Sequence, residues 1–199
     1  SDQAYTDWIY MNSGEVDLSW DAAITPIVID LNGDGINTLS RESSTGSFDL
    51  FGTGKAINSG WISSADAFLA IDANANGKVD NISELFGGNS KGDGFAKLAS
   101  FDSNGDGVVN ADDADFGRLL VWQDLNGNHQ TDAGELRSLL EAGVESLKVD
   151  FVELPAVDAN GNLHLERSSA TLVGGQQVDM SDIYLNVSAE DAEAAGSVF

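Results

Sequence analysis

The chain has no cysteine and only two prolines among its 199 residues. The lack of cysteine excludes disulfide bridges, thiolate zinc sites and cysteine nucleophiles. The sequence holds no long apolar run of the kind that spans a membrane. Its first ten residues have neither a basic region nor an apolar core, so we expect no Sec-type signal peptide there. We therefore expect either a segment of a longer chain or a protein exported by another route.

Positive charge is also scarce, with 9 Lys and Arg against 33 Asp and Glu, for a formal charge of −24. Repulsion makes nucleic acid and anionic membranes poor partners, whereas cations and basic surfaces fit. Hydrophobic residues make up 42% of the chain, including nine Phe and four Trp. That content is enough for one core, so we expect a single folded domain without membrane insertion.

Apolar spacing predicts both strands and short helices. Strands are expected within 1–23, at 26–29, in a hairpin over 48–62 and repeatedly from 146 to 187, with helices at 83–88, 94–102, 111–124 and 133–144 and either type at 65–72. We predict an α+β fold, a compact single domain of antiparallel strands and short helices organised around several EF-hand-like calcium loops. Residues 1–23 would be a strand segment packed on the domain, 24–187 the calcium-dependent ligand-binding module, and 188–199 a tail or linker.

A motif of alternating Asp and Asn recurs along the chain at irregular spacing. It occurs at 30–36, 72–80, 102–113, 124–135 and 158–164. The irregular spacing indicates a reused motif and not a solenoid repeat. Calcium takes six to eight oxygen ligands, which an EF-hand loop supplies from positions 1, 3, 5, 7, 9 and 12 with Gly at position 6. The motif therefore predicts calcium sites, about four or more in number.

Two loops fit that pattern at every ligand position. The first offers Asp102, Asn104, Asp106, the Val108 carbonyl, Asn110 and Asp113. The second offers Asp124, Asn126, Asn128, the Gln130 carbonyl, Asp132 and Glu135. Its sixth residue is His129 instead of Gly, which has to tolerate an awkward backbone conformation.

Three further loops fit less completely. One offers Asp72, Asn74, Asn76, the Lys78 carbonyl and Asp80, and its closing acid, Glu84, comes one position late. Another offers Asp30, Asn32, Asp34 and the Ile36 carbonyl but has Arg41 at position 12. Asp49, Glu42 or water would have to complete that site. For 158–164 a plain hairpin turn is favoured over a calcium loop, because Asn and Gly are also ordinary turn residues.

The order of three segments carries a family resemblance. PIVIDLNGDGI, GWISSADAFLAIDANANGKVDNISELFG and GFAKLASFDSNGDGVVNADDADFGRLLVWQDLNGNHQTDAGEL together resemble the calcium-dependent module of very large RTX proteins secreted by Gram-negative bacteria. The resemblance covers about 24–187. One branch of the family processes itself at an Asp-Pro bond just before the first segment, and the other is the peptide-binding domain of long adhesins. Here the matching pair is Thr25-Pro26, which favours the adhesin branch.

The resemblance implies an extracellular, calcium-dependent module at the bacterial surface, monomeric within a larger chain. Its partner would be a peptide or protein C-terminus on a host or neighbouring cell, with calcium helping to hold the terminal carboxylate. The loop at 30–36 and the glycine-rich turn at 87–94, whose backbone N–H groups could bind a carboxylate, are the candidate ligand contacts. The residues concerned are Asp30, Asn32, Asp34, Gly87, Gly88, Gly92 and Asp93. A further family loop at 48–54 keeps only Asp49, so we expect that site to be lost.

Other functions stay open as alternatives. The module could be a calcium-rigidified spacer of a long adhesin, an autoprocessing module or, more remotely, a dockerin-type domain. No Ser-His-Asp or zinc-ligand spacing occurs, so we expect no enzyme. Trp61 and Trp122 adjoin apolar runs, which favours core positions over a ligand groove.

Overall fold

The computed structural model describes residues 25–88 and 90–196. The strand segment predicted within 1–23 lies outside the described residues. The described part contains one large sheet, a two-stranded sheet and two short α-helices. None of the described helices has the length and apolar character that crossing a bilayer requires.

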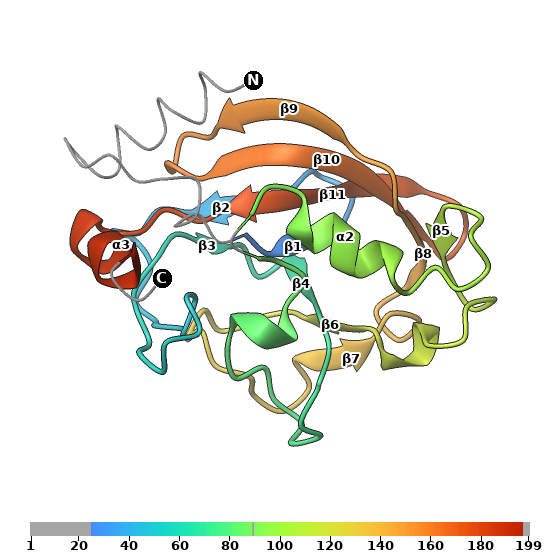
Figure 1. The fold of residues 1–199 in the computed structure, drawn as a ribbon, viewed down its shortest axis with the longest axis horizontal. Helices are drawn as coiled ribbons and strands as arrows, with labels where there is room; N and C mark the ends of the chain where they lie inside the picture. The colour runs from blue at the N-terminus through green and yellow to red at the C-terminus, as the bar shows by residue number, and fades with distance from the viewer. Residues whose placement is uncertain (1–24, 89, 197–199) are drawn as a thin grey trace.

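The large sheet has nine strands, and every pairing in it is antiparallel. Its order is β5-β8-β10-β11-β1-β4-β6-β7, and β9 pairs with β10 beside β8 (Figure 1). The strands are β1 (Ile27–Asp30), β4 (Asp66–Ala70), β5 (Val108–Val109), β6 (Leu120–Trp122), β7 (Leu136–Ser138), β8 (Val144–Lys148), β9 (Val152–Val157), β10 (Leu163–Leu172) and β11 (Gln177–Tyr184). The small sheet pairs β2 (Thr38–Leu39) with β3 (Trp61–Ile62).

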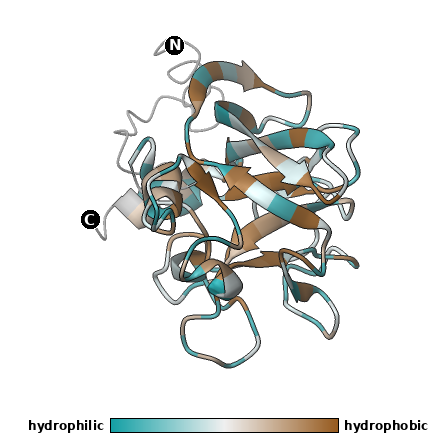
Figure 2. Ribbon diagram, turned by 90° about the vertical axis from the view of Figure 1, so that its right-hand side faces the viewer, coloured by the Kyte–Doolittle hydropathy of each residue, from teal (hydrophilic) through white to brown (hydrophobic). Residues whose placement is uncertain are grey.

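Both faces of the central strands are buried, which explains why β1 and β4 are continuous apolar runs. Val28 and its register partner Phe68 point into one hydrophobic cluster. Ile27 and Ile29 point into a second cluster on the opposite face. Figure 2 shows the hydrophobic colouring concentrated on the strands in the middle of the molecule. The sheet therefore separates two cores.

Different segments cover the two faces. Residues from 48–62 and helix α3 (Ala189–Gly196) belong to the first cluster, together with Trp61 and Trp122. Helix α2 (Asp93–Ala99) contributes Phe95 and Leu98 to the second cluster and lies across the sheet in Figure 1. Both Trp side chains are 0% exposed, which confirms that they are core residues.

The fold class predicted from the sequence is wrong. The described residues form mostly antiparallel β structure with two short α-helices, and not an α+β domain organised around EF-hand-like loops. An EF-hand joins two helices, whereas none of the Asp/Asn loops in the described residues lies between two α-helices. The loop at 124–135 links β6 to β7, and the loop at 30–36 follows β1. The sheet and its two cores organise the fold, and the loops connect its elements.

Two predicted helices are strands. Residues 111–124 contain only the 3₁₀ turn η3 (Phe116–Arg118) before β6, and 133–144 contain β7. The run at β6 is paired on both sides, with β4 and with β7, so tertiary pairing overrides its helical spacing. The ambiguous segment at 65–72 is strand β4, and 83–88 begins with the 3₁₀ turn η2 (Ile82–Glu84).

Other predictions are confirmed. The helix expected at 94–102 is α2, and the strands expected after residue 146 are present as β8 to β11. The division into a module at 24–187 and a tail or linker at 188–199 stays a prediction; within that segment, α3 places Ala192 and Ala195 in the first hydrophobic cluster.

Candidate metal centre

Four of the five Asp/Asn loops, those that begin at Asp30, Asp72, Asp102 and Asp124, share one arrangement around their first aspartate. One carboxylate oxygen of that Asp accepts the backbone N–H of the residue at position 6. The N···O distances are 2.8 Å from Gly35 to Asp30, 2.8 Å from Gly77 to Asp72, 2.9 Å from Gly107 to Asp102 and 3.0 Å from His129 to Asp124. This contact closes each loop into a tight turn around the carboxylate.

Position 6 has a left-handed backbone in all four loops. Gly35, Gly77 and Gly107 have φ angles of 94°, 76° and 85°, which glycine adopts without strain. His129 has a φ of 61° and is held by packing. Its ring stacks on Trp61 at a centroid distance of 3.8 Å, and its Nε2 atom lies 2.8 Å from Ser44 Oγ. Burial lowers the pKa of His129 to about 4, so the ring is neutral at physiological pH.

The closing acids of three loops also share one role. One oxygen accepts the backbone N–H of position 2, and the other accepts that of position 9. The distances are 3.0 and 2.8 Å for Glu84, 2.8 and 2.9 Å for Asp113, and 3.0 and 2.9 Å for Glu135. All three side chains are buried. The turn η2 absorbs the extra residue before Glu84, so the late acid still reaches its place.

The acids at position 9 are kept ionised by side-chain amides. Asn74 and Asn76 donate to one oxygen of Asp80 at 2.9 and 2.7 Å. Asn126 and Asn128 donate to one oxygen of Asp132, both at 2.8 Å. These hydrogen bonds lower the pKa of both carboxyls. These two loops thus bring carboxylate and amide oxygens together, the donor set that suits calcium.

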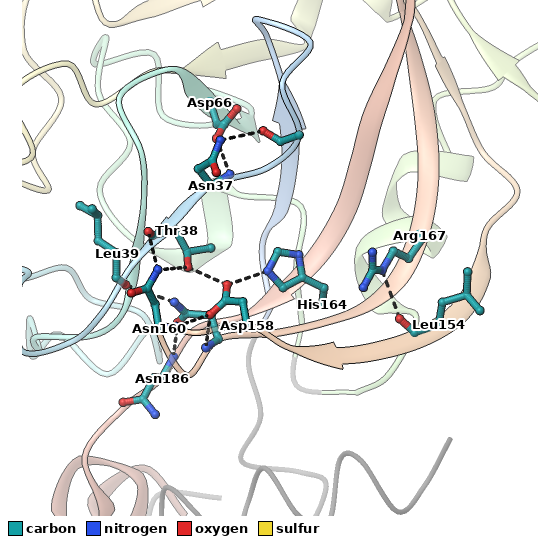
Figure 3. Close-up of polar contacts among 12 residues, drawn as sticks. Asn37, Thr38, Leu39, Asp66, Leu154, Asp158, Asn160, His164, Arg167 and Asn186 are labelled. Atoms are coloured by element: carbon teal, nitrogen blue, oxygen red, sulfur yellow. Dashed lines mark hydrogen bonds and ion pairs between the residues drawn. The ribbon is translucent and has the colours of Figure 1, made fainter.

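The loop at 30–36 takes its missing acid from another strand. Asp66 on β4 is the register partner of Asp30 on β1. Carboxylate oxygens of Asp30, Asp34 and Asp66 all lie within 4.8 Å of one another. Asp66 is 0% exposed, and its Oδ2 atom accepts hydrogen bonds from the Asn37 N–H at 2.8 Å and from Ser63 Oγ at 3.0 Å (Figure 3). Its Oδ1 atom has no hydrogen-bond partner among the described residues.

Neither of the residues suggested from the sequence completes that loop. Asp49 accepts the N–H groups of Thr53 and Gly54 at 3.0 and 2.9 Å, so its carboxylate closes its own turn. Glu42 lies 3.6 Å from the Arg41 guanidinium. Sequence reasoning missed Asp66 because it is 36 residues from Asp30. The available signal was an acid that opens the apolar run of β4, an unfavourable place for an unpaired charge.

The segment at 158–164 is the turn between β9 and β10, as the hairpin interpretation predicted. Asp158 Oδ2 accepts the Thr38 hydroxyl at 2.6 Å and lies 2.8 Å from His164 Nε2 (Figure 3). Asn160 Nδ2 donates to the Thr38 carbonyl at 3.0 Å. This turn therefore fastens the hairpin to the small sheet.

The two groups of predicted ligand contacts lie at opposite ends of β1. Asp30, Asn32 and Asp34 follow the strand, whereas a Cβ atom at Gly87 would overlap the carbonyl of Thr25, which precedes it. Gly92 caps helix α2, and Asp93 begins it, with an oxygen that accepts the Ser90 N–H at 3.0 Å. The structure does not bring the two groups into one site.

A hollow of about 260 Å³ adjoins the loop at 30–36. Its lining includes Gly35 and Ile36 of the loop together with His164 and Arg167 of β10. Arg167 donates through Nε to the Leu154 carbonyl at 3.1 Å, which orients its guanidinium (Figure 3). Asp158 and Asp179 also line the hollow, and the loop of the three-carboxylate cluster borders it through Gly35 and Ile36.

The family model that matches this chain is the SPM domain, over residues 27–186. The chain belongs to the SPM domain family. It is also 40% identical over 168 residues to the iron-regulated protein FrpA of Neisseria meningitidis serogroup C. That match covers 80% of this chain and 15% of the relative, so the chain spans a small part of the relative's length. The family agrees with the RTX-related module that the order of segments predicted.

Proposed function

We propose that this SPM domain is a calcium-dependent ligand-binding module of a secreted bacterial RTX adhesin, and that it captures an exposed peptide or protein C-terminus. The RTX-related family and the similarity to FrpA support an extracellular setting. Calcium would occupy the loops that begin at Asp30, Asp72, Asp102 and Asp124. There it neutralises carboxylates that otherwise repel one another.

The observation that carries the proposal is the cluster of Asp30, Asp34 and Asp66 beside the hollow. With one oxygen from each carboxylate, the cluster supplies three ligand atoms, and Asn32 and the Ile36 carbonyl would raise the number to five, fewer than the six to eight oxygens that calcium takes. The other three loops have a closing acid within the loop, whereas this one borrows a single acid and borders the hollow through Gly35 and Ile36. A terminal carboxylate in the hollow would supply further oxygens to the ion, and Arg167 would offer it a charge-assisted hydrogen bond.

The experiment is binding to an array of peptides with free or amidated C-termini, in millimolar calcium and again in EDTA. We expect binding that needs both calcium and the free carboxylate. The variant Asp66→Asn should lose this binding while keeping the folded structure. The matched control Asp115→Asn removes an exposed carboxylate on η3's N-terminal side and should bind as the parent does.

The second candidate function is a calcium-rigidified spacer of a long adhesin. It is favoured by the three loops that are closed by their own acids, because such loops are suited to stabilising the fold. Calcium that raises the melting temperature without any peptide binding would support the spacer. We propose no enzyme activity: the bond before β1 is Thr25-Pro26, and incubation with calcium should give no discrete cleavage product on a gel.

A further inference from the structure

A second group of buried oxygens lies on the sheet, away from the Asp/Asn loops. Asp182 of β11 is the register partner of Ile27 of β1. Glu166 of β10 lies at the irregularity in the β10–β11 register, between His164 and Arg167. Thr25 precedes β1 by two residues. The relative exposures are 0% for Asp182 and Glu166 and 1% for Thr25, so three adjacent strands bring these groups together in the interior.

Most of these oxygens have no hydrogen-bond partner. Both carboxylate oxygens of Asp182, Oε2 of Glu166 and Oγ1 of Thr25 are unpartnered among the described residues. The remaining oxygen of Glu166 accepts the Tyr184 hydroxyl at 3.0 Å. Each buried polar group without a partner costs free energy, and an uncompensated buried carboxylate costs several times more. So many unpartnered oxygens in one place indicate a missing ligand.

One side of this group of oxygens is closely covered. Helix α2 lies directly on the carboxylate, because a Cβ atom at Gly94 would be 2.9 Å from Asp182 Oδ2 and 2.7 Å from the Phe86 carbonyl oxygen. Within the described part of the chain, neither Asp182 nor Glu166 takes part in an ion pair. The ligand must therefore be small, and it must be positive to balance two carboxylates.

Protonation is the alternative way to neutralise the pair. Burial raises the pKa of Asp182 well above its ordinary value, the charge of Glu166 raises it further, and the nearby Thr25 hydroxyl lowers it. Burial also raises the pKa of Glu166. A protonated Asp182, however, would carry an O–H group that needs an acceptor; the Thr25 hydroxyl is near, but neither oxygen of Asp182 makes a geometrically complete hydrogen bond among the described residues. Protons would remove the charge and leave the unpartnered oxygens.

We propose that Asp182, Glu166 and Thr25 form a buried site for one divalent cation of the calcium type, separate from the Asp/Asn loops. Every available donor is an oxygen, which is the ligand that hard cations prefer. The two carboxylates balance the charge of the ion. Bound there, the ion would tie β10 and β11, near the C-terminal end of the domain, to the start of β1. Because the site is buried, it should exchange its ion slowly.

The test counts calcium ions per molecule by native mass spectrometry, after calcium loading and brief exposure to EDTA. We expect the parent chain to keep one ion more than Asp182→Asn and one more than Glu166→Gln. The control Asp150→Asn, which removes an exposed carboxylate at the end of β8, should match the parent. Loss of ions from the Asp/Asn loops would lower the count equally in the parent and in all three variants. A difference between the parent and the two site variants therefore reports on the buried site, whether or not the loops bind calcium.

An equal ion count in the parent and in Asp182→Asn would overturn the proposal and indicate a protonated pair, since Asn has the shape of the neutral acid. If Asp182→Asn does not fold, infrared spectroscopy of the calcium-loaded parent decides the question. We expect no carbonyl stretch from a buried protonated carboxyl at neutral pH, and the presence of that band would overturn the proposal. Thr25→Val, which replaces the hydroxyl with a methyl group, should shorten retention of the ion.

Discussion

The loop at 124–135 and the loop at 30–36 begin alike and close differently. In the first, Glu135 binds the N–H groups of Leu125 and Asp132, so the loop is complete within twelve residues. In the second, the closing acid is Asp66 on another strand, with one oxygen left unpartnered among the described residues. A loop that is closed by its own acid is suited to stabilising the fold. A loop whose closing acid comes from another strand can leave coordination positions of a bound ion open for a ligand.

The largest expected effect comes from removing calcium from both kinds of loop at once. A ligand bound only by the native state contributes about 4 kcal/mol at a thousandfold excess over its dissociation constant. EDTA should therefore lower the melting temperature sharply, and added calcium should restore it while magnesium restores less. A melting curve that EDTA leaves unchanged would contradict the assignment of calcium to these loops.

The pH dependence of calcium binding should distinguish the loop at 30–36. Burial raises the pKa of Asp66 to about 6. In the absence of calcium, the folded state then binds more protons than the unfolded state between pH 4 and 6. The stability due to this group, about 3 kcal/mol, is present below pH 4 and is lost as pH rises through 6.

Calcium needs the ionised form of Asp66, so binding at this loop should weaken about tenfold for each pH unit below 6. Isothermal titration calorimetry in two buffers of different ionisation enthalpy would measure the proton released on binding. Asp66→Asn should abolish that release. Equal proton release by the variant and the parent would assign the titration to another group.

Glu135→Gln should destabilise the loop at 124–135, because Glu135 is the acid that closes this loop. The variant places an amide N–H₂ group against one of two buried backbone N–H donors, at a cost of about 2 kcal/mol. Denaturant unfolding without calcium measures the change, since the hydrogen bonds exist without the ion. The control Glu141→Gln alters an exposed acid in the same hairpin region and should change stability by less than about 0.5 kcal/mol. Equal stabilities for the two variants would refute this role of Glu135.

The smallest expected change in stability comes from substitutions at position 6 of the Asp/Asn loops. His129→Gly relieves a φ of 61° but removes a buried ring and its contacts with Trp61 and Ser44, so we expect a net loss of about 1 kcal/mol. Gly77→Ala should cost a similar amount for the opposite reason, because a Cβ atom there meets nothing and only the left-handed backbone is strained. Thermal melts of both variants without calcium would measure this. A His129→Gly variant more stable than the parent would show that strain outweighs packing.

The sequence predicts what is local in the loops. The acids predicted at position 12 of the loops from Asp102 to Asp113 and from Asp124 to Glu135 hydrogen-bond to neighbours within the same loop, while their role as calcium ligands stays a prediction. The late Glu84 makes the same kind of contacts within its own loop. Helix α2 followed from the spacing of its own apolar residues, Phe95 and Leu98.

The sequence failed where a contact depends on pairing between distant strands. The segment that becomes β6 has helical spacing, yet hydrogen bonds to β4 and β7 make it a strand. Asp66 and Asp182 were missed because strand pairing alone places them in their sites. Asp66 is the register partner of Asp30 on β1, and Asp182 is the register partner of Ile27 on the same strand. No local pattern encodes such a register.

By itself, then, the sequence determined the closed loops, their first and closing acids, and the RTX-related family. The tertiary structure alone decided that a sheet with a core on each face organises the domain. It also decided which loop borrows its acid and which carboxylates are buried without partners. The physical reason is distance along the chain: a loop of twelve residues closes on itself, whereas a sheet register joins residues that only folding brings together.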